Sequence, residues 1–244
     1  MNNRNCRLLI VLTVCVSILW VSPRQVVGTS GRIDSAPVRP SLVQNAQQLV
    51  VVESETDRST RAVVTGYDLV TRDGQELWQQ TLGPYQARLG RSGVSLRHRE
   101  GDGTTPQGSW GLVSIFGLGV EPNLLMPYRQ VKPGDCWVSD VRSVRYNTYS
   151  TGKWCLGNSE NLWSIAKNGP YVLSVVTDYN VNPVVKNRGS AIFIHRHTYT
   201  KSGLTRPTSG CVSVDQNAII KISHWLDATR NPRVVVGTNA WLQK

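Results

Sequence analysis

Short runs of apolar and β-branched residues recur along most of the chain, and Gly, Pro, Asn or Asp bounds each of them. Such runs are typical of β-strands, and spacings of about ten residues between several of them favour antiparallel connections. Few stretches show helical spacing. The pattern therefore predicts a mainly β fold, a sandwich or a barrel-like sheet. The predicted strands are residues 49–52, 61–70, 76–81, 171–177, 191–195 and 233–236.

Two segments have helical character. In residues 215–228 the apolar side chains recur at the spacing of one helical face, and Asp215 is a suitable N-cap. Residues 159–167 predict a short helix that ends before the turn-forming sequence Asn168-Gly169-Pro170. We therefore expect one or two short helices beside the sheet.

Residues 1–28 have the pattern of a secretory signal peptide. Arg4 and Arg7 precede an apolar stretch of fourteen residues, which a polar segment follows up to Gly28. The stretch is shorter than the roughly 20 residues that cross a bilayer, so a cleaved signal is expected rather than a retained anchor. The mature protein is expected outside the cytoplasm.

The segment that follows, residues 29–47, is polar and contains Pro37 and Pro40, which predicts a flexible leader. The folded domain is expected to occupy residues 48–244. A chain of this length can bury roughly 70% of its unfolded surface, which is enough for a substantial core. Internal repeats and low-complexity segments are absent from the sequence.

The chain is basic, with 27 Lys and Arg against 16 Asp and Glu. Without the three arginines of the signal segment, 24 basic and 16 acidic residues leave a net charge of +8. A basic exported protein suits an anionic surface such as a cell wall or membrane headgroups. The sequence has no Lys/Arg run, zinc-finger spacing or aromatic-interleaved basic stretch, so nucleic acid is not an expected partner.

Three cysteines lie beyond the signal segment: Cys136, Cys155 and Cys211. In an oxidising compartment an odd number leaves one thiol free or paired between chains. Cys136 and Cys155 are nineteen positions apart across a turn-rich segment, where a disulfide would contribute about 3 kcal/mol of stability. That pairing leaves Cys211 free. The alternative is that all three cysteines are reduced and buried.

The free cysteine has a candidate base. His195 ends an apolar run, and the turn Ser209-Gly210-Cys211 follows it sixteen positions later. A thiolate attacks acyl carbons far better than a thiol, so a catalytic cysteine needs a nearby imidazole. The sequence predicts Cys211 as a nucleophile with His195 as its base. The alternative is a buried cysteine beside a core histidine, since cysteine is among the most buried residues.

A zinc site is an alternative to this interpretation. His195, His197 and Cys211 resemble three zinc ligands, but no Asp or Glu adjoins them as a base and no second cysteine lies at ligand spacing. We therefore expect neither a metal nor another cofactor. The glycine-rich residues 101–108 lack the Lys-Ser/Thr ending of a phosphate-binding loop and predict a tight connection.

Three stretches resemble the L,D-transpeptidase catalytic domain, the YkuD-like family of bacterial peptidoglycan enzymes. His195 with residues 208–212 (T-S-G-C-V) matches the family's His followed by Ser/Thr-x-Gly-Cys and an apolar residue. Residues 99–108 are similar to its E-G-D-G-x-T-P-x-G loop, and residues 88–94 to its R-x-G-x-x-G stretch. Together with the weaker pair Tyr179-Asn180 they span most of the expected domain.

One position departs from the family. Ser209 stands where most members carry a histidine between the Ser/Thr and the Gly of the cysteine turn. A subgroup with Ser or Ala at that place and a second histidine after the strand resembles this chain more closely. His197 is therefore a candidate to compensate for the missing imidazole.

The resemblance implies a mixed β-sandwich-like sheet and acyl transfer from tetrapeptide stems of peptidoglycan. Cys211 would form a thioester at the carbonyl between meso-diaminopimelate and D-Ala, with His195 as acid and base. The N–H groups of Gly210 and Cys211 would stabilise the oxyanion. Thr208 and Ser209 would orient the imidazole or position substrate, or would only form the turn. Expected partners are stem peptides and the cell-wall surface, and the resemblance implies that the exported protein works in the periplasm or the cell wall.

Two other functions remain open. One is hydrolysis by the same fold, as an L,D-carboxypeptidase or endopeptidase. The other is a non-catalytic, basic module that binds the cell wall. Either of the enzymatic functions would belong to cell-wall biogenesis and bear on cell shape. His98 and His224 have no partners in the sequence and are expected to be structural.

Overall fold

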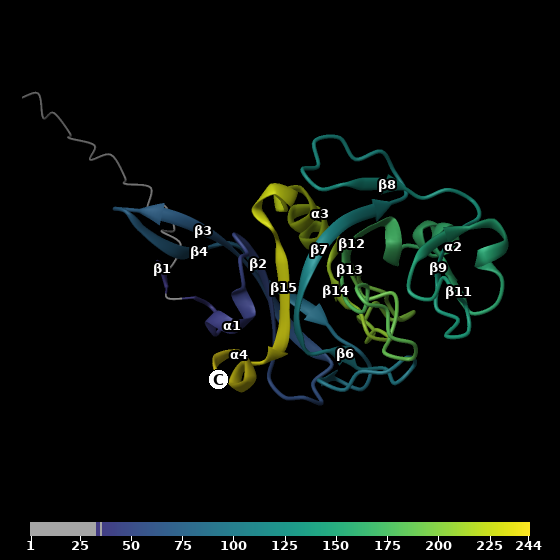
Figure 1. Cartoon of the computed structure of the whole chain (residues 1–244), viewed down its shortest axis with the longest axis horizontal. Helices are drawn as coiled ribbons and strands as arrows, with labels where there is room; N and C mark the ends of the chain where they lie inside the picture. Colours follow the sequence, from purple (N-terminus) through teal and green to yellow (C-terminus); the bar gives the residue numbers. More distant parts are fainter. Residues whose placement is uncertain (1–32, 35) are drawn as a thin grey trace, which may run out of the picture. The chain divides into compact units, whose positions relative to one another are not determined.

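A large mixed β-sheet organises the part of the chain that the structure describes, residues 33–34 and 36–244 of a computed structural model (Figure 1). Its hydrogen-bonded order is β1-β4-β14-β13-β12-β7-β15-β2-β3, and β8 pairs with β7. The strands are β1 (Ile33–Asp34), β2 (Gln48–Ser54), β3 (Arg61–Arg72), β4 (Gln75–Arg88), β7 (Gly108–Gly117), β8 (Tyr128–Gln130), β12 (Leu173–Thr177), β13 (Phe193–Arg196), β14 (Val212–Val214) and β15 (Arg233–Thr238).

The sheet closes on itself. β3 pairs with β2 on one side and with β4 on the other, and β4 pairs back to β14. Closure leaves no free edge along this circuit, as in a barrel. Three pairs are parallel, β13 with β14, β15 with β2, and β7 with β8. The predicted mainly β fold is confirmed, and the sheet is mixed rather than uniformly antiparallel.

Shorter elements complete the described chain. Two small sheets contain β5 (Val94–Ser95) with β6 (Thr105–Pro106), and β10 (Tyr149–Thr151), β9 (Asp135–Val138) and β11 (Ser159–Asn161). The α-helices are α1 (Pro40–Val43), α2 (Leu162–Lys167), α3 (Gln216–Trp225) and α4 (Asn239–Gln243). The 3-10 turns are η1 (Gly152–Cys155), η2 (Pro170–Val172) and η3 (Ala228–Arg230).

Side chains point alternately to the two faces of a strand, and both faces are buried on several of the predicted apolar runs. On β2, Val50 and Val52 join one buried cluster, which also takes in α3, whereas Leu49 and Val51 join another. Both faces of this strand are therefore covered, and no polar position is needed. β13 follows the same rule, because Ile194 enters the α3 cluster and Phe193 enters a third cluster.

The helix predicted at residues 215–228 is present as α3. Asp215 caps it, since its carboxylate accepts a hydrogen bond from the Ala218 N–H at 2.8 Å. The helix predicted at residues 159–167 is only partly correct. Its first three residues form β11, which pairs with β9, and Asn161 then caps α2 through the Ser164 N–H.

The folded part of the chain begins earlier than the expected boundary at Gln48. Val38, Leu42 and Ala46 are buried in the cluster that contains Leu49, and the Arg39 N–H donates to the Leu242 carbonyl. The second half of the predicted leader therefore packs on the sheet, because its apolar residues fill the space beside α4. The predicted signal, residues 1–28, lies outside the described residues.

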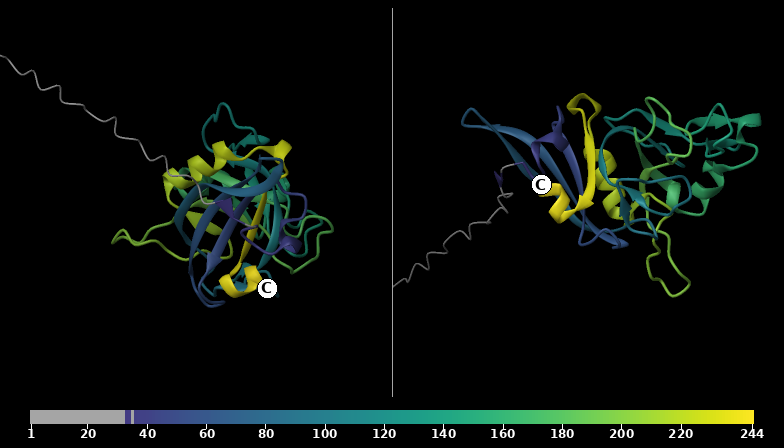
Figure 2. Two further views of the ribbon diagram at one scale, coloured as in Figure 1. Left: turned by 90° about the vertical axis from the view of Figure 1, so that its left-hand side faces the viewer. Right: turned by 60° about the horizontal axis from the view of Figure 1, so that its bottom comes forward.

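The two ends of the sheet differ (Figure 2). The β3–β4 hairpin extends from one end, while β9, β10 and β11 lie at the other. The Cys136–Cys155 disulfide joins β9 to η1 at this second end. Within the residues that the structure describes, no helix has the length and apolar character needed to cross a membrane.

Candidate active site

Two neighbouring parallel strands bring Cys211 and His195 to one face of the sheet. In their register Ile194 lies opposite Val212 and His195 opposite Ser213, so Cys211 lies beside Phe193. Side chains at i and i+2 share a face, and neighbours across strands share it too. Cys211 and His195 are 7% and 6% exposed, and both line one cavity of about 270 Å³. We call it the Cys211 cavity.

The Cys211 thiol is unpaired and fully engaged in local contacts. Its Sγ donates to the Ala191 carbonyl at 3.1 Å and accepts from the Phe193 N–H at 3.4 Å. The hydroxyl of Tyr171 also interacts with this thiol. In this arrangement the thiol hydrogen points to a backbone carbonyl, so attack on a substrate requires the hydrogen to turn toward a base.

His195 is oriented as a base by its own strand. Its Nδ1 lies 2.7 Å from the Arg196 carbonyl oxygen. A carbonyl only accepts, so Nδ1 carries the hydrogen and the neutral ring keeps the lone pair on Nε2. The ring also packs edge-on against Tyr171, with centroids 5.3 Å apart.

Burial determines the protonation of both groups. It lowers the pKa of His195 to about 4, the Arg196 hydrogen bond opposes this shift, and nearby His197 adds to it. Burial raises the pKa of Cys211 to about 12, and the charge of Glu160 adds to the shift, while the Phe193 N–H and the Tyr171 hydroxyl oppose it. At neutral pH the resting pair is therefore a thiol and a neutral imidazole, not an ion pair.

The stretches 88–94, 99–108 and 208–212 meet at the cysteine. The Thr105 hydroxyl accepts from the Gly90 N–H at 2.8 Å and donates to the Cys211 carbonyl at 3.4 Å. Gly90 also forms a bridge with Thr208. A Cβ at Gly90 would lie 2.2 Å from the Gly103 carbonyl, so only glycine allows this approach. Segments 88–94 and 99–108 thus hold a cysteine turn that is distant from both in sequence.

Within that turn the Thr208 hydroxyl donates to the Cys211 carbonyl at 2.6 Å and accepts from the Gly210 N–H at 3.1 Å. The Gly210 N–H was expected to serve an oxyanion and is instead engaged by this side chain. Of the two N–H groups expected to stabilise the oxyanion, the Cys211 N–H is the one that Thr208 does not bind. Ser209 is exposed and lines the Cys211 cavity.

The structure does not bring His197 to the sulfur. Its Nδ1 lies 2.9 Å from the Ser213 hydroxyl, and it lines a neighbouring cavity with Arg196 and Tyr199. The two histidines therefore do not share a ligand position with Cys211. Among the described residues, no group of three His, Cys, Asp or Glu side chains could hold a metal ion.

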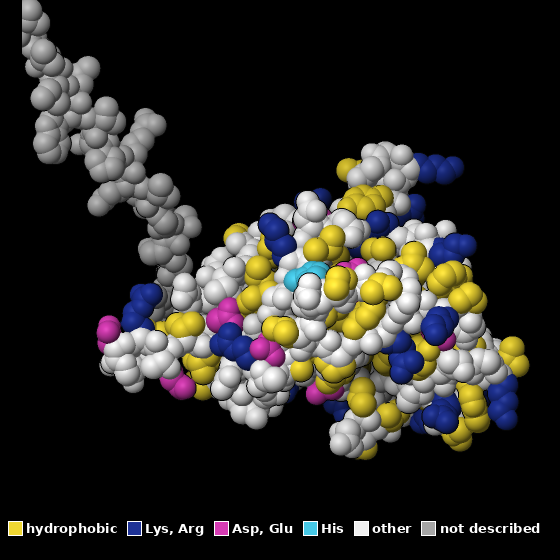
Figure 3. Space-filling view, turned by 90° about the horizontal axis from the view of Figure 1, so that it is seen from above, with side chains coloured by type: hydrophobic (Ala, Val, Ile, Leu, Met, Phe, Trp, Pro, Cys, Tyr) yellow, Lys and Arg dark blue, Asp and Glu magenta, His cyan; other side chains and the backbone are white. Residues whose placement is uncertain are grey.

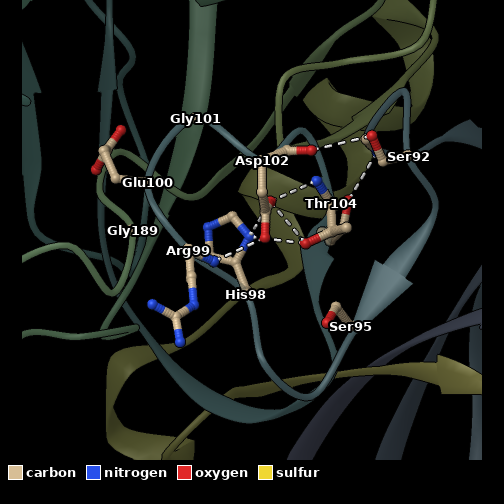
Figure 4. Close-up of polar contacts among 12 residues, drawn as sticks. Ser92, Ser95, His98, Arg99, Glu100, Gly101, Asp102, Thr104 and Gly189 are labelled. Atoms are coloured by element: carbon tan, nitrogen blue, oxygen red, sulfur yellow. Dashed lines mark hydrogen bonds and ion pairs between the residues drawn. The ribbon is translucent and has the colours of Figure 1, made fainter.

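His98 lines the Cys211 cavity, although the sequence suggested only a structural role. Its Nδ1 lies 3.1 Å from Asp102 Oδ1 and 3.0 Å from the Thr104 hydroxyl (Figure 4). Asp102 also accepts the Arg99 and Thr104 N–H groups, each at 2.8 Å. Burial lowers the pKa of His98, and Asp102 opposes that shift. The spacing of His98 and Asp102, four residues apart, was the available sequence signal.

The His98 ring fits between two glycines. A Cβ at Gly189 would lie 2.3 Å from its Nε2, and a Cβ at Gly210 would lie 3.6 Å from its Cε1. The backbone of Gly189 has φ +103°, which favours glycine as well. His98 therefore supports the cysteine turn from the side of the 99–108 loop.

Two carboxylates, Glu100 and Glu160, also line the Cys211 cavity, whereas no Lys or Arg of the described chain does. Glu100 accepts from the Tyr146 hydroxyl at 2.6 Å, and Glu160 accepts from the Tyr171 hydroxyl at 2.5 Å. Sequence reasoning missed both tyrosine–carboxylate pairs because their members are 46 and 11 positions apart. His224 lies elsewhere, 3.6 Å from Glu121.

Comparison with known proteins agrees with this geometry. The family model of the YkuD L,D-transpeptidase catalytic domain matches residues 42–238, which include every residue named above in the Cys211 cavity. No curated protein matches the chain. Since the family model covers most of the sequence, the chain belongs to the L,D-transpeptidase catalytic domain (YkuD) family.

Proposed function

We propose that this protein is an exported L,D-transpeptidase that acylates Cys211 with a tetrapeptide stem of peptidoglycan. The observation that supports the proposal most directly is the pairing of an unpaired thiol and a neutral imidazole in one cavity. These groups lie on adjacent parallel strands inside the matched family region. A thiol beside a base, in a cavity partly closed to water, is suited to acyl transfer.

In the first step the Cys211 sulfur attacks the carbonyl carbon between the L-centre of meso-diaminopimelate and D-Ala. The thiol proton moves to His195 Nε2 as the carbon–sulfur bond forms. The Cys211 N–H stabilises the oxyanion of the tetrahedral intermediate. When the intermediate collapses, the carbon–nitrogen bond breaks, and His195 returns its proton to the leaving amine of D-Ala.

In the second step an amine of a neighbouring stem attacks the thioester. His195 accepts a proton from that amine, and the departing sulfur is protonated again as the new amide forms. Because Cys211 and His195 are both neutral at rest, each half-reaction depends on proton transfer within the bound complex rather than on a preformed thiolate.

The surface charge suits a cell-wall partner. Figure 3 shows one face of the molecule, on which Lys and Arg side chains gather toward the end that carries β9 and β11. We propose that this basic surface meets anionic wall polymers and that residues 1–28 direct export. Cell-wall biogenesis and cell shape would then be the processes served. Exposed cations on β8, α2 and the segments beside the small sheet include Arg129, Lys132, Arg142, Arg145, Lys153, Lys167 and Lys186.

Product analysis tests the proposal. Purified protein is incubated with tetrapeptide muropeptides, with and without an added acceptor amine. The Cys211→Ala variant, treated in the same way, is the control. We expect release of D-Ala and a new amide to the acceptor, both absent in Cys211→Ala. Release of D-Ala without any amide product would instead establish a hydrolase. No turnover by either protein, while both bind peptidoglycan, would establish a non-catalytic wall-binding module.

A further inference from the structure

Tyr171 lies between the nucleophile and a carboxylate. Its hydroxyl donates to Glu160 Oε2 at 2.5 Å and also interacts with the Cys211 thiol. The side chain is fixed in place, since Tyr171 is 5% exposed and its ring packs edge-on against Phe116 and Phe193. A hydroxyl held this firmly between two groups has only one hydrogen to donate.

Glu160 reaches this hydroxyl from the small sheet. It lies on β11 opposite Trp137 of β9, and it lines the Cys211 cavity. Burial raises its pKa to about 7; the Tyr171 hydrogen bond opposes that shift, and the charge of Glu100 adds to it. The titratable groups that share the cavity with Glu160 are His98, Glu100, Tyr171, His195 and Cys211.

We propose that Glu160 and Tyr171 form a hydrogen-bonded relay in which the protonation state of Glu160 decides whether the Tyr171 hydroxyl donates to the Cys211 sulfur. When Glu160 is ionised, its carboxylate accepts the hydroxyl hydrogen, and the sulfur receives none from this side. When Glu160 is protonated, its own O–H donates to the Tyr171 oxygen. The Tyr171 hydrogen is then released to the sulfur.

The relay matters at the moment when negative charge develops on sulfur. The thiol proton leaves for His195, and a hydroxyl donor then stabilises the thiolate, as does loss of the Glu160 charge. No covalent bond changes within the relay, because the Glu160 and Tyr171 hydrogens only change acceptor. Tyr171 interacts with the reacting sulfur through its hydroxyl, while Glu160 acts through Tyr171 as a positioning residue. The catalytic use of the relay rests on the proposed function, whereas its effect on the thiol does not.

Alkylation of Cys211 by iodoacetamide, followed by intact mass from acid to alkaline pH, tests the relay without any peptidoglycan. Glu160→Gln removes a charge and keeps a donor, so we expect about tenfold faster alkylation at neutral pH. Tyr171→Phe removes the hydroxyl and keeps the ring, so alkylation becomes slower. Tyr128→Phe is the matched control, because the Tyr128 hydroxyl donates to the Gly119 carbonyl outside the cavity.

The pH profile separates the relay from a structural effect. In the wild-type protein the logarithm of the rate should show a shoulder near pH 7, where Glu160 loses its proton and takes the hydroxyl hydrogen. The shoulder should vanish in Glu160→Gln and persist in Tyr128→Phe. A profile with no shoulder in the wild-type protein, or one unchanged in Glu160→Gln, would overturn the relay.

A double variant tests whether the effect passes through the hydroxyl. The gain from Glu160→Gln should be much smaller in a Tyr171→Phe background, and an equal gain in both backgrounds would reduce Glu160 to a simple charge effect. Far-ultraviolet circular dichroism reports folding; if Tyr171→Phe does not fold, the Glu160→Gln profile decides alone. If the protein forms an acyl adduct with a peptidoglycan stem but the variants leave the alkylation profile unchanged, only the relay is refuted. If the variants shift the alkylation profile but no acyl adduct forms, only the proposed function is refuted.

Discussion

Burial determines the protonation states of the two residues that carry the proposed chemistry. Cys211 and His195 are each less than 10% exposed, and water solvates neither charged form well. In the proposed mechanism the resting pair is neutral, and charge develops only when substrate displaces the Ala191 contact of the thiol. Such a thiol should be less prone to adventitious oxidation than a preformed thiolate, which is an advantage outside the cytoplasm.

The buried imidazole predicts a specific loss of stability in acid. In the folded protein His195 gains a proton only near pH 4, whereas in the unfolded chain it does so near pH 6.5. Acidification between these values therefore favours unfolding, by about 3 kcal/mol at the end of the range. This loss of stability is absent above pH 6.5, the pKa of the histidine in the unfolded chain, and is complete below about pH 4, its pKa in the folded protein.

Urea unfolding at several pH values measures this loss in wild type and in His195→Gln. Glu160 acts in the opposite sense over a similar range, because its pKa is raised, so the difference between the two proteins isolates the histidine. We expect the wild-type protein to lose about 3 kcal/mol more than the variant between neutral pH and pH 4. Parallel pH profiles of the two proteins would refute a buried, neutral His195.

At the level of secondary structure, most strands that carry the core could be predicted from the sequence. Runs such as Leu49 to Val52 are apolar on both faces and have no competing helical pattern. β7 could not be predicted, because Gly111 interrupts it and Gly108 and Gly117 end it, although the strand lies between β12 and β15. Its place is set by tertiary pairing rather than by local preference.

The candidate site was predictable where its residues are close in sequence. His195 and Cys211 lie sixteen positions apart and occupy adjacent strands, so a strand followed by a turn was sufficient to suggest them. Glu160 was not predictable, because residues 159–167 carry a pattern that favours a helix. Pairing of β11 with β9 overrides that preference and turns Glu160 into the cavity.

The packing of His98 beside the cysteine turn predicts that position 189 requires glycine. Gly189→Ala would place a Cβ 2.3 Å from His98 Nε2 at φ +103°, whereas Gly74→Ala has φ +77° and nothing within 4 Å. The Gly74 variant should cost about 1 kcal/mol from backbone strain alone, and the Gly189 variant about 3 kcal/mol. Chemical denaturation measures both. Equal losses would mean that His98 does not pack against Gly189 as described.

Across the whole molecule, a closed sheet supports a smaller sheet that the disulfide fastens. β9 carries Cys136 and pairs with β11, so the bridge to Cys155 restrains the strand that bears Glu160. The predicted export of the chain agrees with an oxidising location in which this bond persists. The disulfide and the predicted export are thus consistent with the same proposed site of action.

The disulfide predicts both a covalent map and an energy. Non-reducing peptide mapping should link Cys136 to Cys155 and leave Cys211 in an unlinked peptide. Replacing both bridge cysteines by serine should lower the free energy of unfolding in urea by about 3 kcal/mol. Cys211→Ser, which breaks no disulfide, is the control. A peptide that links Cys211 to either partner would remove the proposed nucleophile.

Intact-mass spectrometry of the protein mixed with a synthetic tetrapeptide stem tests the central claim most directly. We expect an adduct with the mass of the stem less its terminal D-Ala, localised to Cys211 and absent in Cys211→Ala. His195→Gln should accumulate the same adduct about 10²- to 10⁴-fold more slowly. An adduct at another residue, or turnover of the stem by Cys211→Ala at the wild-type rate, would contradict the account.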